Sequence, residues 1–206
     1  MAKVMLKNVR ISFPDLFEAQ SIKGGAPRYS ATFLFEKDHP CHDAIKAAIS
    51  EVVKAKWLDK ANKAAQEIKA NGGWPIKDGD IKEYAGYEGN LYIRANNKMR
   101  PQVIDRDKSP LTATDGKIYS GCRVNAQVDV YAMDSKDFGK QANVSLLAVQ
   151  FHKDDERFTG GGSAAAAALT DHLYFRFFPG AAFSSHEVTK ITQETGETKY
   201  ALIQDK

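Results

Sequence analysis

The chain opens with alternating apolar and polar residues, a pattern typical of a β-strand with one buried face. Val9, Ile11 and Phe13 alternate with polar neighbours, and we expect all three side chains to point into a core. A turn rich in glycine and proline follows at 24–27, and the segment 28–36 then alternates again. The two segments predict a pair of antiparallel strands joined by that turn.

Between residues 38 and 73 the apolar spacing changes to that of an amphipathic helix. Pro40 falls in the predicted first turn, where a missing N–H is tolerated, and either Asp38 or His39 can cap this end. We expect a long helix with a break near Asp59. An amphipathic helix of this kind lies against a sheet, so we assign it a structural role.

Strand patterns return after the helix. The segments 90–95 and 101–105 are short, whereas 122–133 is the clearest strand in the chain, with every second residue facing inward. The segment 143–151 is apolar at nearly every position, and we expect it to be covered on both faces. Five or more strands with one inserted helix predict a mainly β fold, either a small antiparallel barrel or a sandwich.

The composition changes at the end of this region, and it predicts three parts of the chain. They are a barrel domain over 1–159, a Gly/Ala linker over 160–170 and a C-terminal tail over 171–206. Late in the tail the residues alternate around a Thr-Gly turn at 195–196, which is typical of a hairpin.

The composition is that of a soluble globular protein, with 43% hydrophobic and 27% charged residues among 206. No apolar run approaches the roughly 20 residues that span a bilayer, and the N-terminus lacks a signal-peptide pattern. The two cysteines, Cys41 and Cys122, lie far apart, which argues against a disulfide framework. We therefore expect a protein of the reducing cytoplasm that makes no contact with a membrane.

Several enzyme classes lack their motifs here. The sequence contains neither a phosphate-binding loop ending in Gly-Lys-Ser/Thr nor the Gly-x-Ser-x-Gly turn of serine hydrolases. Three strand carboxylates, Asp105, Asp129 and Asp134, keep a metal-dependent nuclease or recombination enzyme open as an alternative. The run His-Pro-Cys-His at 39–42 holds zinc-type ligands but lacks the second pair that zinc needs. We expect a helix cap and a buried thiol there, and no metal or other cofactor.

The polar faces of two predicted strands combine aromatic and basic side chains. Tyr92 and Arg94 share the outer side of one strand, and Arg123 and Tyr131 share that of another. Flat rings stack on unpaired bases while Lys and Arg follow the phosphates, so the combination is typical of binding to single-stranded nucleic acid. The candidate stacking residues are Tyr92, Tyr131, Trp74 and Tyr119, and the candidate phosphate contacts are Arg94, Lys98, Arg100, Arg123 and Lys117.

Each of these residues also has a structural interpretation. Taken alone, a strand tyrosine such as Tyr92 or Tyr131 is more often a residue at the edge of the core, with the hydroxyl in water. Trp74 can plug the end of the barrel, and the strand arginines can pair with Asp129 across strands. The loop aromatics that can instead fold over a groove are Trp74, Tyr84, Tyr87 and Tyr119.

Three segments of the chain, in the order in which they follow one another, point to a known family. They read LKNVRISFPDLFEAQSIKGGAPRYSATFLFEK, YIRANNKMRPQVID and IYSGCRVNAQVDVYAMD. The central signature consists of Tyr119, Gly121, Cys122, Val124 and Asn125. Over about residues 4 to 160 the sequence resembles the tailed-phage single-stranded DNA-binding proteins of the T7-like OB-fold type. This resemblance implies a modified OB-fold barrel, non-catalytic binding of single-stranded DNA, and a role in phage replication or recombination.

The resemblance also implies protein partners, namely replication proteins such as a polymerase or a helicase. Proteins of that group generally recruit partners through an acidic tail, but residues 171–206 hold five acids, four bases and five aromatics before residue 184. This composition argues against recruitment through the tail. The tail can pack on the body, join a homodimer, or reflect an altered reading of the end. A structural phage protein that assembles through this aromatic tail is a third class of function.

Overall fold

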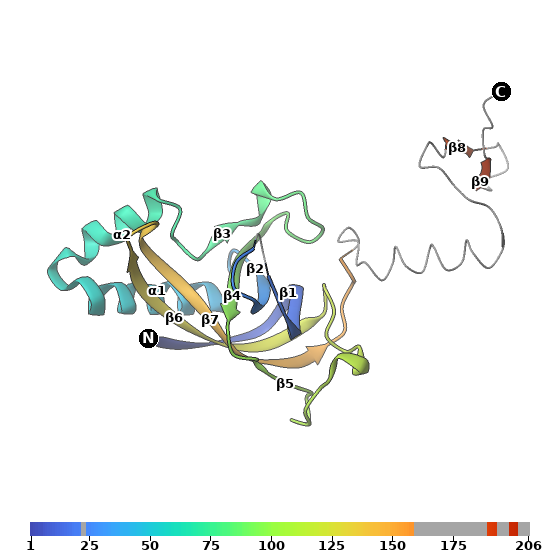
Figure 1. Cartoon of the computed structure of the whole chain (residues 1–206), viewed down its shortest axis with the longest axis horizontal. Helices are drawn as coiled ribbons and strands as arrows, with labels where there is room; N and C mark the ends of the chain where they lie inside the picture. The colour runs from blue at the N-terminus through green and yellow to red at the C-terminus, as the bar shows by residue number, and fades with distance from the viewer. Residues whose placement is uncertain (22–23, 159–188, 193–197, 202–206) are drawn as a thin grey trace. The chain divides into compact units, whose positions relative to one another are not determined.

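Five strands form the barrel of the structure, a computed structural model that describes residues 1–21, 24–158, 189–192 and 198–201. The five strands are β1 (Ala2–Gln20), β2 (Arg28–Glu36), β4 (Asn90–Asn97), β6 (Arg123–Ser135) and β7 (Gly139–Lys153). β1 lies between β2 and β6, and β2 and β6 continue the sheet to β4 and β7 (Figure 1).

Closure of the barrel depends on the pairing of β4 with β7. Asn96 of β4 and Ser145 of β7 form a parallel bridge, whereas β1, β2, β4, β6 and β7 otherwise pair antiparallel. A five-stranded Greek-key barrel with these pairings is the OB-fold, and the predicted OB-like barrel is confirmed. Two short strands extend the sheet, β3 (Lys77–Asp78) beside β4 and β5 (Gln102–Ile104) beside β7.

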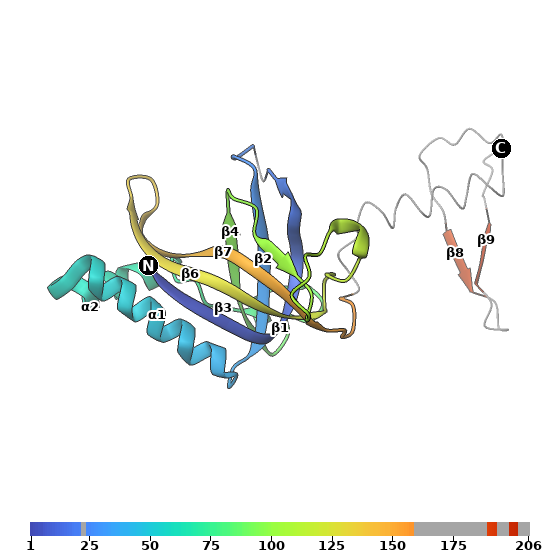
Figure 2. The ribbon, with the colours of Figure 1, turned by 90° about the horizontal axis from the view of Figure 1, so that it is seen from below.

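The inserted helical segment is broken as the sequence predicts. It consists of α1 (Pro40–Trp57), the 3-10 turn η1 (Leu58–Lys60) and α2 (Ala61–Ala70). Ile45, Ile49 and Val52 of α1 are buried in the core of the barrel. Both views show the helices beside the long β6–β7 hairpin (Figures 1 and 2). The helical segment therefore covers one side of the barrel. It does not cover the outer face of β2 and β4.

The His-Pro-Cys-His run caps α1. The backbone N–H of Cys41 donates to Nδ1 of His39 at 3.2 Å, and the Cys41 side chain is buried. Burial raises the pKa of the Cys41 thiol, so it stays protonated at neutral pH. Within the described residues there is no group of three His, Cys, Asp or Glu side chains placed to hold a metal ion.

The start of the barrel corrects the prediction for Phe13. Val9 and Ile11 lie in the core as expected, but Phe13 is 42% exposed. Phe13 has φ +49°, and the register of β1 against β2 shifts directly after Ser12. Such a bulge adds a residue to the strand and reverses the alternation, which turns the ring toward solvent.

The prediction for residues 143–151 was also wrong in part. In β7 the buried residues alternate with half-buried ones instead of being covered on both faces. The register against β6 shifts between Gln127 and Val128, so Leu147 has no direct partner there and lies half-buried beside Ala148. β2 is the strand that is covered on both faces, because all six residues at 30–35 are buried.

The described part of the tail is a hairpin. β8 (Thr189–Thr192) pairs antiparallel with β9 (Thr198–Ala201), as the alternation around the Thr-Gly turn predicts. The predicted linker over 160–170 and the aromatic stretch before residue 184 lie outside the described residues.

Two further 3-10 turns complete the barrel unit, η2 (Gly79–Ile81) and η3 (Ala113–Asp115). No helix in the described ranges has the length and apolar character that crossing a membrane requires.

Candidate nucleic-acid interface

Three cavities on the outer face of the barrel share the side chain of Arg94. We name them the aromatic cavity (about 400 Å³), the tryptophan cavity (about 330 Å³) and the arginine cavity (about 430 Å³). Tyr92 lies between the first two, and Asn96 between the second and third. Because Arg94 borders all three, the cavities form one branched depression centred on the outer side of β4.

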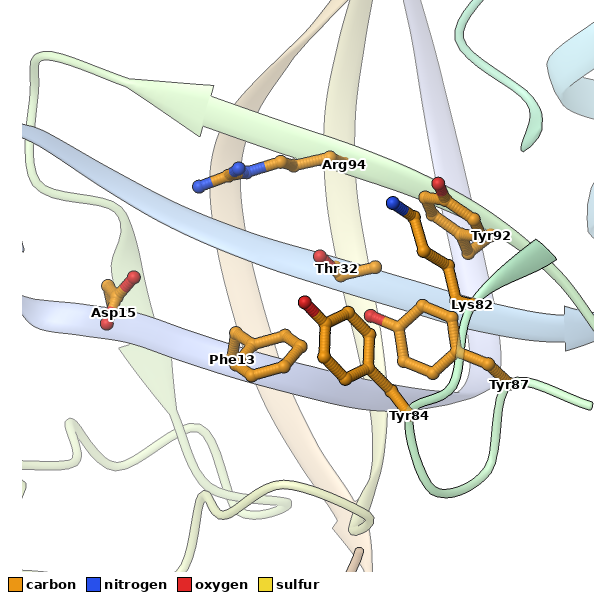
Figure 3. A pocket seen from close by; sticks show the side chains of 8 residues that line it. All are labelled: Phe13, Asp15, Thr32, Lys82, Tyr84, Tyr87, Tyr92 and Arg94. Carbon is orange, nitrogen blue, oxygen red and sulfur yellow. The ribbon is translucent and has the colours of Figure 1, made fainter. Parts of the chain in front are cut away.

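A row of four aromatic rings defines the aromatic cavity. The ring centroids of Phe13 and Tyr84 are 5.3 Å apart, those of Tyr84 and Tyr87 are 5.4 Å apart, and those of Tyr87 and Tyr92 are 5.2 Å apart. The first two pairs meet edge to face, the arrangement that ring quadrupoles favour. Phe13 comes from β1, Tyr92 from β4, and the other two rings come from the loop between η2 and β4 (Figure 3).

The four rings differ in their access to solvent. Phe13 is 42% and Tyr84 51% exposed, whereas Tyr87 is only 2% exposed and packs against both Tyr84 and Tyr92. Tyr92 is half-buried. Its pKa is raised by burial and by the neighbouring Tyr87 and Tyr84, so the phenol stays neutral. The cavity thus offers exposed, uncharged rings to a ligand.

Charged side chains surround these rings. Arg94 and Lys82 both line the aromatic cavity and are exposed. Ser30 links two of the charged groups, since its Oγ donates to Oδ2 of Asp15 at 3.1 Å and lies 3.4 Å from Nη2 of Arg94. In Figure 3 the guanidinium of Arg94 and the carboxylate of Asp15 lie beyond one end of the ring row, and Lys82 lies near Tyr92. The two cations outnumber the single carboxylate of this cavity.

The arginine cavity continues the positive charge along β2 and β4. Arg28 and Arg94 both line it, and Nη1 of Arg28 donates to Oδ1 of Asn96 at 2.9 Å. Arg28 and Arg94 are exposed, and no acidic side chain lines this cavity within the described residues. Two guanidinium groups with free donors suit phosphate oxygens.

The tryptophan cavity brings Trp74 close to Tyr92. Trp74 is half-buried and packs against the core, so its predicted role as a plug and its predicted place at the groove both fit its position. The ammonium of Lys69 lies 4.8 Å from the Trp74 ring, and Lys77 lines the same cavity. Asn143 of β7 also lines this cavity.

Two of the predicted stacking residues lie outside these cavities. Tyr131 is half-buried on β6, opposite Asn143 in the register, and lines none of the three. The hydroxyl of Tyr119 donates to Oδ1 of Asp154 at 3.0 Å, and the guanidinium of Arg157 lies 3.9 Å from its ring. Tyr119 therefore already has partners for its hydroxyl and for one ring face.

The predicted phosphate contacts divide in a similar way. Arg94 belongs to the branched depression, and Lys98 and Arg100 are exposed in the turn after β4. Arg123 donates to Oδ2 of Asp155 at 2.6 Å instead of pairing with Asp129. Lys117 pairs with Asp105, which raises the pKa of Lys117 and lowers that of Asp105. These two ion pairs neutralise two of the five predicted phosphate contacts.

Phe13, Lys82 and Arg28 are among the residues of the depression that the sequence reasoning missed. The alternation in β1 pointed Phe13 inward, and only the bulge exposes it. Lys82 lies in a loop with no periodic signal, and Arg28 stands at the start of β2. The position of a basic residue, Arg28, next to a strand rich in aromatics is a signal that could have identified it.

The sequence and the fold were compared with known proteins. A family model described as the ssDNA-binding protein of Enterobacter phage Enc34 matches residues 2–173. Protein p50 of Acyrthosiphon pisum secondary endosymbiont phage 1 is 47% identical over 173 residues, which cover 82% of this chain and 93% of that protein.

Solved structures of phage single-stranded DNA-binding proteins also match this chain. The single-stranded DNA-binding protein from bacteriophage Enc34 in complex with ssDNA matches with a TM-score of 0.60 and 31% identity, over 76% of this chain and 89% of that one. The single-stranded DNA-binding protein gp2.5 of bacteriophage T7 matches with a TM-score of 0.50 and 14% identity, over 89% of this chain and 100% of that one. At this lower identity the second match shows a shared fold alone.

Proposed function

The chain belongs to the family of the Enterobacter phage Enc34 ssDNA-binding protein, and we propose on this basis that it binds single-stranded DNA without catalysis. The observation that carries the proposal is the branched depression around Arg94, where exposed rings and guanidinium groups meet. A related structure contains bound ssDNA and shares the barrel.

Bases stack on the rings of the aromatic cavity in this proposal. Phe13 and Tyr84 are exposed and uncharged, and Tyr92 borders both the aromatic and the tryptophan cavity. Each base that stacks on such a ring contributes roughly 1–3 kcal/mol to the binding free energy. Paired bases in a duplex have no free face, so the rings select unpaired strands, and because every base has a face they select little by sequence.

In this proposal the phosphates contact cations that form no ion pair within the described residues. Arg94 and Arg28 share the arginine cavity, and Lys82 stands at the aromatic one. Lys98 and Arg100 extend the positive track into the turn after β4. We give Arg123, Lys117 and Tyr119 a structural role in this proposal, since each already has a partner in the fold.

The proposed biological role is to cover strands that are exposed during phage DNA replication or recombination in the host cytoplasm. Coating protects such strands from nucleases and from hairpin formation. The composition of residues 171–206 gives no acidic segment to recruit a polymerase or helicase. Recruitment of a polymerase or helicase through the tail therefore forms no part of the proposal.

Titration with poly(dT) at two or more salt concentrations tests this function. Trp74 lines a cavity of the depression, so its fluorescence should change on binding. Five free cations predict a log–log salt slope of about −3.5 for a single strand, at about −0.7 per phosphate contact. A slope near zero contradicts the electrostatic part of the proposal.

A second experiment separates the binder from its rivals. A labelled single strand is incubated with the protein and Mg²⁺ and then run on native and denaturing gels. An intact, retarded strand supports the proposal. A shortened strand supports the nuclease that the strand carboxylates left open, and a strand neither retarded nor shortened supports a purely structural phage protein.

A further inference from the structure

Residues 154–158, which follow β7, are tied to the barrel, and we name them the strap. The backbone N–H of Phe158 donates to the carbonyl of Ser120 at 3.1 Å. Nη2 of Arg10, on β1, donates to the carbonyl of Glu156 at 2.5 Å. The strap is therefore held by both backbone and side-chain hydrogen bonds.

Two glycines let the strap approach the barrel closely. A β-carbon on Gly86 would collide with the ring of Phe158, and one on Gly121 would collide with the carbonyl of Glu156. Both glycines have positive φ, +80° and +110°, which other residues rarely adopt. The guanidinium of Arg10 lies 4.2 Å from the centroid of the Phe158 ring. Phe158 thus contacts the backbone of one loop and a cation of β1 at once.

The strap is linked to the middle and to one end of the aromatic row. Gly86 lies between Tyr84 and Tyr87, so the Phe158 ring packs on the backbone that carries these two rings. At the Phe13 end of the row, Oγ of Ser120 accepts from the backbone N–H of Phe13 at 3.1 Å. The same Ser120 accepts from Phe158 through its carbonyl. Three of the four rings in the cavity are therefore linked to the strap within one or two contacts.

We propose that Phe158 is a positioning residue that holds Tyr84 and Tyr87 in the arrangement that binds unpaired bases. The inference rests on the proposed function and concerns a residue outside the three cavities. A stacking ring is effective only if its orientation is fixed before the base arrives, since ordering it on binding costs conformational entropy. Phe158 supplies that order by packing on the backbone of the loop.

Other contacts keep the loop attached when Phe158 is removed. The backbone N–H of Gly89 donates to Oδ1 of Asp80 at 2.5 Å, and Nδ2 of Asn90 donates to the carbonyl of Gly86 at 3.0 Å. Phe158 itself is half-buried and is not part of the barrel core. Phe158→Ala should therefore fold and loosen the ring pair without releasing the loop.

The binding test compares Phe158→Ala with two matched variants on a labelled oligo(dT). Phe158→Ala should bind about tenfold more weakly, within the range of one lost stacking contact, while the salt slope stays as in the unmodified protein. Phe158→Leu keeps apolar bulk against Gly86 and should recover much of the affinity. Phe138→Ala removes a phenylalanine that is 69% exposed in the β6–β7 turn and should change nothing. Unchanged affinity in Phe158→Ala overturns the proposal.

A second measurement needs no DNA. Lys82 lies in the loop that carries Tyr84 and Tyr87, so trypsin cleavage after Lys82 reports the order of this loop. Phe158→Ala should accelerate cleavage after Lys82 and leave cleavage after Lys98 and Lys108 unchanged. Equal acceleration at all three sites indicates general destabilisation and contradicts a positioning role. If the unmodified protein fails to bind oligo(dT), the proposed function falls, and the Lys82 cleavage still decides whether Phe158 orders the loop.

Discussion

The ring centroids of Tyr87 and Tyr92 lie 5.2 Å apart, although Tyr87 belongs to a loop and Tyr92 to the outer face of β4. The loop thus folds back over the strand, and Tyr87 becomes almost fully buried outside the main core. Its burial supports Tyr84 and Tyr92 on either side. Because of this contact, the outer face of β4 becomes part of a cavity whose walls are aromatic rings.

Tyr84 and Tyr92 should contribute to binding more than Tyr131 does. Replacement of either by Ala removes a ring of the aromatic cavity and should weaken binding to oligo(dT) by about 1–3 kcal/mol. Tyr131→Ala, outside the three cavities, should change the binding free energy by less than about 0.5 kcal/mol. Fluorescence anisotropy with a labelled strand measures all three. A large effect at Tyr131 would instead place the strand across β6.

Arg94→Ala should lower both the affinity and the salt dependence of binding. Arg94 borders all three cavities, so its loss removes about one phosphate contact and should make the log–log slope shallower by about 0.7. Lys117→Ala serves as the control, because Lys117 pairs with Asp105 and should leave the slope unchanged. The opposite ranking would show that the DNA runs past η3.

Asp15→Asn should tighten binding. The Asp15 carboxylate lines the aromatic cavity and repels the phosphates of a bound strand, whereas asparagine can still accept the hydrogen bond from Ser30. At a separation of several ångströms in water the gain is about twofold, and it should fade as salt is added. Weaker binding of this variant would mean that Asp15 accepts a hydrogen bond from a base.

Asp155 should stabilise the fold at neutral pH but not in acid. The N–H of Glu156 and then the guanidinium groups of Arg123 and Arg10 hold the pKa of this carboxyl below its usual value. Its contribution to stability is therefore present above the unfolded pKa of about 4 and is lost as the pH falls through the lower folded pKa. Asp155→Asn should reduce the free energy of unfolding at pH 7 by about 1–2 kcal/mol.

Urea unfolding of the unmodified protein and of Asp155→Asn, at a series of pH values, checks this prediction. The difference between the two proteins should shrink below about pH 4 and vanish once both carry a neutral side chain at this position. A difference that stays constant across the series would show that the charge of Asp155 is not what stabilises the strap.

The strand periodicity was sufficient to predict the outward side of β4. Ile93 and Ala95 are buried, which places Tyr92 and Arg94 on the outer face as expected. The helix break near Asp59 was predicted as well, and η1 interrupts the helical segment at that point. The outward side of β4 depends on local periodicity alone, and local periodicity is what a single sequence displays.

The remaining features of the site depend on contacts between distant residues. The outward turn of Phe13 needs a bulge with positive φ, which residue preferences disfavour and a sequence does not announce. Arg123 and Asp155 are 32 positions apart, and only the finished fold shows that each neutralises the other. The Tyr84 and Tyr87 rings were expected over a groove, but their partner Phe13 comes from a strand about 70 positions earlier, a separation that periodicity cannot bridge.

The parallel bridge between Asn96 and Ser145 also has a consequence for synthesis on the ribosome. β1, β2, the loop with Tyr84 and Tyr87, and β4 are translated first and already carry the aromatic row, but part of the lining of the tryptophan cavity belongs to β7. A nascent chain therefore exposes rings and arginines before β4 can pair with β7 and close the barrel. Closure of the barrel therefore comes late in translation, once nearly three quarters of the polypeptide has been synthesised.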